Sequence, residues 1–441
     1  MNDLNLRSGR RSIQAVRCWR VIRVAMHIAM ISAEYPPRWG GMGSTVHHLA
    51  AHLKSKGHKV SIITRRNSKK LVHNTTSSEI HEVKWAKVPM HFTRSFGRNA
   101  VKKLETVHKI NPVDIVHIHL PMVSLTKKEL SRCKKIGPLV ASLHGSWRGE
   151  RDGLMIARKM REPAVFRNPN DLAILLTANH YSRYEKLAAT MANVSISNSD
   201  ATYRDFINRY EMMDEWDCRT IHWGVDTELF RPMDPHNKSD TADRISIRER
   251  YGIEENDLVL LAVGRLAARK GYSTLLRSFK KIQEEVSNSK LLIVGRGGMK
   301  SFMIKQAKKY GISDNVTIES SLDFEDLSRV YRASDLSVFP SYYEGQGLIP
   351  LEAMSSGIPI IGTDDGPIPE MVDDHVGGLF ELGNHENLAD AIIEHLTNIP
   401  SLKEKGKAGR DRVLENFTFE QTCEKFEVVY ADLIVNSTDQ S

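Results

Sequence analysis

The chain has 441 residues, of which 41% are hydrophobic and 26% are charged. This composition is typical of a soluble globular protein with two or three domains, and it excludes the disordered and fibrous classes. No run of the sequence approaches 18 uninterrupted apolar residues, so we expect no membrane-spanning helix.

The net charge of +8 divides unevenly along the chain. Residues 1–230 contain 37 Lys and Arg against 20 Asp and Glu (+17), and residues 231–441 contain 25 against 34 (−9), which together give +8. This imbalance predicts that the first half meets an anionic partner, either a phosphorylated substrate or a membrane surface; ordinary solvated charge is the alternative. The basic residues are not interleaved with a nucleic-acid recognition module, so no nucleic-acid partner is expected.

The first 23 residues hold six arginines and a single acid, Asp3. They are typical of a basic tail or a targeting segment, but we favour a start of translation at Met26, and expect residues 1–23 to be disordered or not translated. The four cysteines lack the spacing of a zinc site or a disulfide framework, which favours a reducing compartment. We therefore expect a cytoplasmic protein, with peripheral attachment at the inner face of a membrane as an alternative.

Strand-like and helix-like segments alternate from residue 24 onward. In the first half, a helix is expected over 43–57, and strands are expected at RVAMHIAMISA (23–33), KVSIITR (59–65), VDIVHIHL (113–120), PLVASLHG (138–145), NVSISNS (193–199) and TIHWGVD (220–226). The second half repeats the pattern, with helices over 272–286, 299–310 and 325–334, and strands at DLVLLAVGRL (257–266), SKLLIVGRG (289–297), NVTIES (315–320), DLSVFPS (335–341) and IPIIGTD (358–364). Short apolar strands between helices form parallel sheets covered on both faces, so the sequence predicts an α/β fold of two Rossmann-like domains facing across a cleft.

The last segment, FTFEQTCEKFEVVYADLIV (417–435), has the spacing of an amphipathic helix. Its apolar positions recur in steps of four and three, at Phe419, Cys423, Phe426, Tyr430 and Leu433. Such a stripe indicates a helix that covers a large apolar surface.

Two motifs at predicted strand ends could face an anion. EYPPRWGGMGSTV (34–46) fails the G-x-G-x-x-G spacing, and the next strand ends in Arg65 and Arg66 instead of an acid, which disfavours a nicotinamide enzyme. The turn within EYPPRWGGMGSTV can still present backbone N–H groups at the start of the helix that follows. AVGRLAARKG (262–271) places Arg265 and Lys270 at the carboxyl end of a strand, where the two cations suit a diphosphate; a pair of solvated surface cations is the alternative.

SYYEGQGLIPLEAMSS (341–356) holds two carboxylates, Glu344 and Glu352, on either side of a glycine turn. They could be a catalytic acid/base pair, metal ligands, acceptors for a polyol or surface charge. A glycosidase pair usually comes from separate elements, and no third metal ligand is evident, so acceptors for sugar and ribose hydroxyls are favoured. The backbone N–H groups of Gly347 and Leu348 lie where a phosphate would bind. Together these groups would read a nucleotide sugar.

This stretch resembles the E-x7-E signature of retaining glycosyltransferases with the GT-B fold, family four. Over residues 26–435 it is accompanied, in the order of that family, by PPRWGGMGSTVHHLAAHLKSKGHKV, DIVHIHLP, LHG, SISNS, WGVDTELF, VGRLAARKG, LLIVGRGG and GGLF. The resemblance implies transfer of a hexose-type sugar from a UDP-, GDP- or ADP-sugar to a sugar, glycolipid, phosphorylated or lipid-linked acceptor, with no metal and no cofactor. An inverting transferase, a sugar-nucleotide epimerase and a non-catalytic nucleotide-sugar-binding protein remain alternatives.

The resemblance also assigns roles to residues. Glu344 would contact donor-sugar hydroxyls, Glu352 the ribose, and His144 the reaction centre. The diphosphate would be held by Arg265, Lys270 and the backbone of Gly41, Gly347 and Leu348. An acceptor domain is placed at 24–225 and a nucleotide-sugar domain at 226–417, with a helix at 418–435 packing back on the first domain and a tail at 436–441.

Two positions depart from the family pattern. Gln346 replaces a bulky apolar residue and is expected to add a hydrogen bond to the donor sugar, whereas Trp223 replaces an Asn and is expected to alter the cleft. His117 and His119 alternate along one strand and are expected on the cleft floor, in preference to a metal site. The basic helix over 94–109 is expected either to face anionic lipid or to be solvated.

Overall fold

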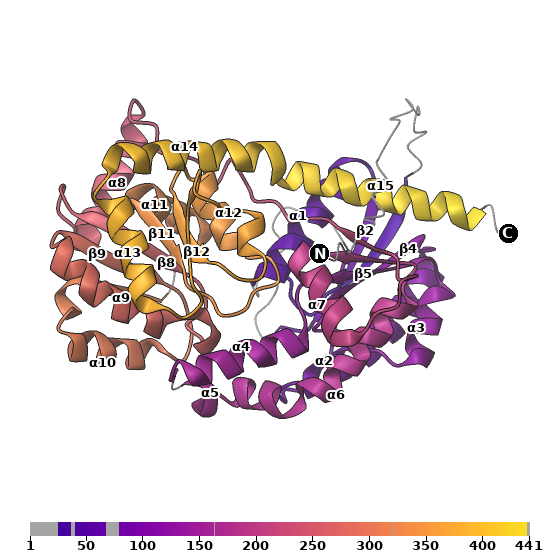
Figure 1. The fold of residues 1–441 in the computed structure, drawn as a ribbon. Coiled ribbons are helices and arrows are strands. Elements are labelled where there is room, and N and C mark those ends of the chain that lie inside the picture. Colours follow the sequence, from indigo (N-terminus) through magenta and orange to yellow (C-terminus); the bar gives the residue numbers. More distant parts are fainter. Residues whose placement is uncertain (1–24, 37–39, 68–78, 163, 321, 439–441) are drawn as a thin grey trace, which may run out of the picture.

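The computed structural model describes residues 25–36, 40–67, 79–162, 164–320 and 322–438. The predicted N-terminal extension lies outside these ranges. Two parallel sheets with helices on both faces form two Rossmann-like domains that face each other, which confirms the predicted fold class (Figure 1). No helix within the described ranges is long and apolar enough to cross a bilayer.

The first domain is built on a sheet of seven strands in the order β3-β2-β1-β4-β5-β6-β7. Strands β1, β4, β5 and β6 are buried along their whole length, as expected for apolar runs such as IVHIHL in β4. The strands are β1 (His27–Ile31), β2 (Lys59–Arg65), β3 (Glu79–Val83), β4 (Ile115–Leu120), β5 (Leu139–Leu143), β6 (Val194–Ser197) and β7 (Cys218–Thr220).

The predicted strand over 220–226 is wrong in extent, because β7 ends at Thr220. Beyond it the chain becomes a linker to the second domain, with one isolated bridge between Val225 and Thr418. Gly224 presses directly on the backbone of Thr418, so that a Cβ there would lie 2.1 Å from the carbonyl carbon. The linker is thus held against the start of the last helix, and it places Trp223 between the domains.

The second domain has a sheet of six strands in the order β10-β9-β8-β11-β12-β13. Five of them coincide with predicted strands, whereas the short GGLF segment of β13 was not predicted as a strand. The strands are β8 (Leu258–Val263), β9 (Ser289–Val294), β10 (Val316–Glu319), β11 (Leu336–Phe339), β12 (Ile360–Thr363) and β13 (Gly377–Phe380).

Helices cover both faces of each sheet (Figure 1). In the first half they are α1 (Gly41–Ser55), α2 (His91–Ile110), α3 (Lys127–Lys134), α4 (Trp147–Lys159), α5 (Ala164–Arg167), α6 (Pro169–Met191) and α7 (Asp200–Tyr210). In the second half they are α8 (Lys238–Arg250), α9 (Tyr272–Glu285), α10 (Lys300–Tyr310), α11 (Phe324–Ala333), α12 (Leu348–Ser355), α13 (His385–Leu396), α14 (Ile399–Asn416) and α15 (Phe419–Thr438), with the 3-10 turns η1 (Ala268–Lys270), η2 (Ser313–Asn315) and η3 (Ile368–Glu370).

Two connections join the domains on opposite sides. On one side, α14 lies on the second domain and α15 continues from it across the first, as Figure 1 shows in yellow. The buried stripe of α15, formed by Cys423, Phe426 and Tyr430, belongs to the same core cluster as Val46 of α1 and Ile62 of β2. The last helix is therefore part of the core of the first domain.

On the other side, α4 and α5 extend from the first domain beneath the second (Figure 1). Leu154 and Val165 belong to the same buried cluster as Phe279 of α9. The carboxylate of Glu162, which is 2% exposed, accepts hydrogen bonds from the Ser273 N–H (3.0 Å) and the Ser273 hydroxyl (2.5 Å). This part of the first half thus packs into the core of the second domain.

Candidate active site

A cavity of about 430 Å³ lies between the carboxyl ends of the two sheets, where open parallel sheets bind their ligands. Both domains contribute to its walls, and its volume is within the usual range for small-molecule sites. The structure brings together here all residues to which the sequence assigns a donor-binding or catalytic role: Gly41, His144, Arg265, Lys270, Glu344, Gln346, Gly347, Leu348 and Glu352.

The turn between β8 and α9 carries the basic residues of the cavity. It ends at Gly271, which has a left-handed backbone (φ +68°), and where a Cβ would lie 1.9 Å from the carbonyl oxygen of Pro340. Only glycine permits this approach. The close packing brings the turn against the loop that follows β11, and Lys270 Nζ donates to Glu344 Oε1.

Lys270 and Glu344 form a largely buried ion pair, with side chains that are 12% and 15% exposed. Burial lowers the pKa of Lys270, and Glu344 opposes that shift. Burial would raise the pKa of Glu344, but the charges of Lys270 and Arg269 outweigh it and lower the pKa. Glu344 is therefore a carboxylate at neutral pH, and it can accept hydrogen bonds from hydroxyl groups.

Arg269 is a cleft residue that the sequence reasoning missed. Its Nε and Nη2 donate to the two carboxylate oxygens of Glu150 at 2.5 and 2.8 Å, and Glu150 lies on α4 of the first domain. The pair spans the cleft as a bidentate clamp. Arg269 lies in the same motif as Arg265 and Lys270, but its partner, 119 positions away, gave no sequence signal. Arg265 itself is exposed in the cavity.

Two helices from opposite domains begin at the cavity. Gly40 is the N-cap of α1, and Gly347, with φ +91°, is the N-cap of α12. A glycine N-cap has no side chain to accept from the first-turn N–H groups, so these donors can face an anion. Gly41 and Leu348, the first residues of the two helices, both line the cavity.

Glu352 lies further along α12 and lines the same cavity. Tyr331 donates its hydroxyl to Glu352 Oε2 at 3.0 Å. Burial raises the pKa of Glu352 to about 7. This carboxyl group therefore titrates near neutral pH, unlike Glu344, because no basic side chain is paired with it in the described structure.

The first domain and the linker contribute two neutral rings, His144 and Trp223, to the cavity, and we call this part the neutral wall; the acids Glu34 and Glu150 of the first domain line the cavity as well. His144 follows β5, and its Nε2 is 3.0 Å from Nδ1 of His119. Burial lowers the pKa of His144 to about 3, so the imidazole is uncharged at neutral pH. His117 and His119 are both fully buried behind it, and the described residues contain no cluster of three metal-ligating side chains. The expectation that His117 and His119 lie on the cleft floor is therefore wrong, because both side chains are buried behind His144 and do not line the cavity.

The two positions that depart from the family pattern contact each other. The backbone N–H of Trp223 donates to Gln346 Oε1, and Gln346 Nε2 donates to the carbonyl oxygen of Trp223, both at 2.8 Å. The amide expected to bind the donor sugar is therefore engaged with the interdomain linker. Its neighbour Gly345 accepts hydrogen bonds at its carbonyl oxygen from the hydroxyls of Ser199 (2.5 Å) and Thr202 (2.9 Å).

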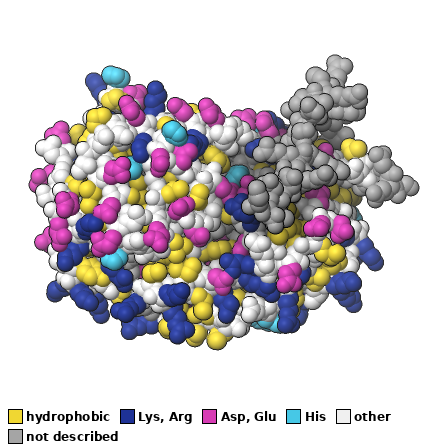
Figure 2. Space-filling view, viewed as in Figure 1, with side chains coloured by type: hydrophobic (Ala, Val, Ile, Leu, Met, Phe, Trp, Pro, Cys, Tyr) yellow, Lys and Arg dark blue, Asp and Glu magenta, His cyan; other side chains and the backbone are white. Residues whose placement is uncertain are grey.

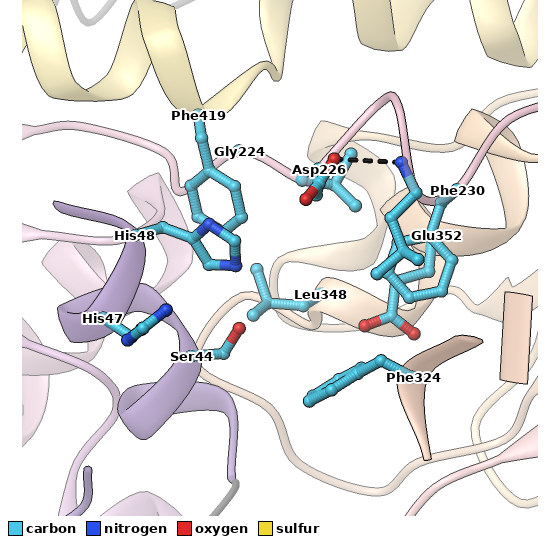
Figure 3. Close-up of a pocket in the computed structure, with 12 residues that line it drawn as sticks. Ser44, His47, His48, Gly224, Asp226, Phe230, Phe324, Leu348, Glu352 and Phe419 are labelled. Carbon is cyan, nitrogen blue, oxygen red and sulfur yellow. Dashed lines mark hydrogen bonds between the residues drawn. The ribbon is translucent and has the colours of Figure 1, made fainter. Parts of the chain in front are cut away.

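A second cavity, of about 180 Å³, adjoins Glu352 on the side of the interdomain linker (Figure 3). Its lining combines α1, the linker and the first residue of α15. The ring of His48 stacks on Phe419 with centroids 4.1 Å apart, and Figure 3 shows the Glu352 carboxylate pointing toward Phe324. Leu348 and Glu352 line both cavities, so α12 separates them.

Two family models match the chain, one after the other. The model described as Glycosyltransferase Family 4 matches residues 39–229, and the model described as Glycosyl transferases group 1 matches residues 243–412. Together with the two facing Rossmann-like domains, these matches define a GT-B glycosyltransferase. The chain belongs to the family-four type of this class.

Individual relatives agree with this assignment. The chain is 24% identical over 405 residues to the N-acetyl-alpha-D-glucosaminyl L-malate synthase of Bacillus anthracis, covering 90% of this chain and 95% of the relative. It is 31% identical over 210 residues to a GDP-mannose-dependent phosphatidylinositol monomannoside mannosyltransferase of Mycobacterium tuberculosis, covering 46% and 52%. Among solved structures, Anabaena HepE in complex with UDP and glucose superposes with a TM-score of 0.68 at 18% identity, covering 92% of this chain and 100% of that one, which supports the fold.

Proposed function

We propose that the protein is a retaining glycosyltransferase that moves a hexose-type sugar from a nucleoside diphosphate sugar to a sugar, glycolipid or lipid-linked acceptor. The observation that carries the proposal is the convergence, in one cavity, of the Lys270–Glu344 pair, Arg265, Glu352 and the start of α12. Glu344 accepts from the sugar hydroxyls, Glu352 from the ribose, and the cations with the helix N-terminus bind the diphosphate. Among the similar proteins, the mycobacterial mannosyltransferase is GDP-mannose-dependent, and the Anabaena HepE structure holds UDP and glucose.

The chemical step is departure of the diphosphate from the anomeric carbon. The C1–O bond to the phosphate breaks, and the acceptor oxygen bonds to C1 on the same face. The acceptor proton passes to the departing phosphate oxygen, so that no protein nucleophile is needed. Arg265, Lys270 and the N–H groups of Gly347 and Leu348 stabilise the negative charge that develops, and one contact of this kind is worth about 3–4 kcal/mol. The scheme requires neither a metal nor a cofactor.

His144 faces this reaction centre as a neutral imidazole. A ring with a pKa of about 3 can donate or accept a hydrogen bond without placing a positive charge beside the developing oxocarbenium ion. Its buried setting also excludes water from the anomeric carbon. The neutral wall therefore favours attack by the acceptor over hydrolysis.

For the acceptor, we propose a membrane-held anionic molecule and a peripheral position at the cytoplasmic face. The predicted basic helix of residues 94–109 supports a membrane contact only in part. Arg98 and Lys102 are exposed, but Arg94 is paired with Glu129 of α3 at 3.0 Å. A stronger candidate is the surface formed by α4, α5 and α6, because α4 begins at the cavity and its residues Trp147 and Glu150 line it.

This α4–α6 surface combines exposed apolar and basic side chains. All three carboxyl groups within residues 153–190 are buried, since Glu162, Asp171 and Glu185 are at most 7% exposed. Figure 2 shows dark-blue and yellow side chains side by side along the lower edge, where Figure 1 draws these helices. An anionic lipid surface would satisfy both features. The exposed members are Met155, Arg158, Lys159, Arg161, Phe166, Arg167, Leu172, Leu176, Arg183 and Lys186.

The membrane contact is tested by sedimentation with vesicles. We expect the protein to bind vesicles that contain phosphatidylglycerol and not vesicles of phosphatidylcholine alone. Phe166→Glu with Leu176→Glu should abolish binding, whereas Ile304→Glu on α10, which replaces an equally exposed apolar residue elsewhere, should not. Equal binding by all variants, or none by the wild type, would reject this surface and leave the transferase proposal intact.

The transferase proposal is tested by incubating the enzyme with sugar nucleotides and a mixture of acceptors, and by following products with mass spectrometry and proton NMR. We expect one donor to be consumed, with a product that keeps the α configuration of the donor sugar. A β-linked product would identify an inverting transferase, and a changed sugar still attached to the nucleotide would identify an epimerase. Binding of donors without any turnover would indicate a nucleotide-sugar-binding protein.

A further inference from the structure

Trp223 is almost fully buried at the point where the two domains and α15 meet. The side chain is 2% exposed, and it belongs to the linker that follows β7. One face of its ring stacks on His144, with centroids 5.5 Å apart and an interplanar angle of 9°. It also stacks on Phe426 of α15, at 4.9 Å and 23°. The indole therefore lies between the proposed reaction centre and the last helix.

The loop between β11 and α12 (residues 340–347), which carries Glu344 and which we call the donor-sugar loop, is bonded to the same residue. Gln346 is 3% exposed, and its amide makes two hydrogen bonds of 2.8 Å with the backbone of Trp223. Gly345 contacts the carbonyl oxygen of His144 so closely that a Cβ would approach it to 2.3 Å. Gly345 and Gln346, which directly follow Glu344, therefore hold Glu344 in a fixed position relative to the first domain.

His144 is supported from behind by a row of buried rings. It pairs with His119 at 3.0 Å, and the ring of His119 lies on His117 with centroids 4.1 Å apart. His117 is hydrogen-bonded on both nitrogens, to Ser142 Oγ at 2.7 Å and to the Tyr430 hydroxyl at 2.8 Å. The row fixes the imidazole from the sheet side, and Trp223 covers it from the linker side.

We propose that Trp223 and Gln346 act as a positioning pair that fixes the neutral His144 relative to the donor-sugar loop and keeps water from it. The proposal rests on the proposed transferase function, and it assigns a role to the two residues that depart from the family pattern. Neither residue takes part in bond making. The indole sets the orientation of the imidazole, and the amide sets the distance between the loop that carries Glu344 and the wall that carries His144.

The pairing explains why an amide is suited to position 346. The backbone N–H and carbonyl oxygen of Trp223 are both buried there, and a single Gln side chain offers one acceptor and one donor in the required order. An apolar side chain of the same length would leave both backbone groups without a partner. A misplacement of about 1 Å at a reaction centre can lower a rate roughly 100-fold.

Steady-state kinetics with variants of the pair test this role. We expect Trp223→Ala and Gln346→Met to lower kcat by roughly 10- to 100-fold while the KM for the donor stays within about threefold of the wild type. The fraction of donor that is hydrolysed instead of transferred should rise. Trp223→Phe, which keeps a stacked ring, should restore most of kcat. Trp216→Ala removes a tryptophan that stacks on Tyr203 away from the cleft and should leave kcat unchanged.

A second readout does not depend on turnover. The ring protons of His144 are followed by NMR between pH 5 and 8, where the wild-type imidazole should not titrate. Trp223→Ala should admit water and bring its titration into this range, and Trp216→Ala should not. If the His144 ring in Trp223→Ala still does not titrate between pH 5 and 8, the proposed role of the pair is wrong. The role is also wrong if the variants change only the KM for the donor and not kcat. If the wild type turns over no donor, the transferase proposal fails. The NMR result still shows whether Trp223 and Gln346 position His144.

Discussion

The two walls of the cleft differ in charge. The wall contributed by the second domain carries Arg265, the Lys270–Glu344 pair and Glu352, all ionisable groups near the start of a helix. The side of the first domain contributes no Lys or Arg to the described lining. It carries the neutral wall of His144 and Trp223 together with the acids Glu34 and Glu150, of which Glu150 is paired with Arg269. Within the described part of the first half, no Lys or Arg lines the cleft. Basic side chains gather instead on the α4–α6 surface, where all six Lys and Arg of residues 153–190 are exposed.

Under the proposed function, this difference separates two tasks. A charged wall binds a diphosphate and stabilises it as a leaving group, because buried cations act strongly in a water-poor site. A neutral wall provides a dry surface beside the anomeric carbon without repelling the positive charge that develops there. Substitutions on the two walls should accordingly have different signatures.

The largest effect is expected on the charged wall. Lys270→Ala should lower kcat/KM for the donor by about 10²–10³-fold, because it removes a cation from the leaving diphosphate and leaves Glu344 buried beside it without its partner. Steady-state kinetics measure this loss. Lys281→Ala on α9 removes an exposed lysine paired with Glu386 and Asp390, and it should change kcat/KM by less than about twofold.

The next effect concerns the attachment of α4 and α5 to the second domain. Burial raises the pKa of Glu162 to about 7 from the ordinary 4.5. Since the folded state then holds its proton more tightly, the stability from this group is complete below pH 4.5 and is lost as pH rises through about 7. The loss amounts to about 3 kcal/mol.

Glu162→Gln should therefore flatten the dependence of unfolding free energy on pH between 5 and 8, with Ser273 still bonded to the amide. Denaturant unfolding at several pH values measures this. Glu394→Gln, on α13 and exposed, serves as the control and should leave the dependence unchanged. Equal pH dependences for the wild type and Glu162→Gln would contradict the assignment.

A smaller effect is expected behind the neutral wall. Tyr430→Phe removes the hydroxyl that bonds His117 and leaves a fully buried ring nitrogen without that partner. We expect a loss of about 1–3 kcal/mol in unfolding free energy, measured by urea denaturation. Tyr203→Phe on α7, outside the row of histidines, is the matched control. An unchanged midpoint for Tyr430→Phe would show that α15 contributes by apolar packing alone.

The smallest effect concerns Glu352, whose pKa is raised to about 7 by burial. Its carboxylate accepts hydroxyl hydrogen bonds better than its protonated form, so donor affinity should weaken as pH falls below 7. About tenfold weaker binding is expected at pH 6 than at high pH. Calorimetric titrations at pH 6 and 8 measure the difference, which Glu352→Gln should abolish.

Sequence reasoning reached the local parts of this architecture. Apolar runs located most strands, and the glycine-rich turns with Arg265, Lys270, Glu344 and Glu352 identified groups that do meet in one cavity. It missed β3, whose half-exposed EIHEV sequence has no apolar run. The strand predicted at 220–226 shares only Thr220 with β7, because the chain beyond Thr220 lies against Thr418, a contact that the local sequence does not show.

Contacts between distant segments could not be predicted. The clamp between Arg269 and Glu150 joins residues 119 positions apart, and the pair of Gln346 with Trp223 joins residues 123 apart. In both pairs, the sequence around the polar groups is like that around ordinary surface residues and does not indicate the contact. Only the fold brings the partners together, and this is why Gln346 was expected to bind the donor sugar when its amide binds the linker.

The central claim is that the charged wall of the second domain binds a nucleoside diphosphate sugar. The most direct measurement is calorimetric titration of the wild type and Glu352→Ala with a panel of UDP-, GDP- and ADP-sugars at pH 8. We expect one donor to bind the wild type with a 1:1 stoichiometry and to bind Glu352→Ala at least about tenfold more weakly, since each lost hydrogen bond to a charged group costs about 1.5–3 kcal/mol. Absence of binding by every sugar nucleotide, or equal binding by the variant, would contradict the claim.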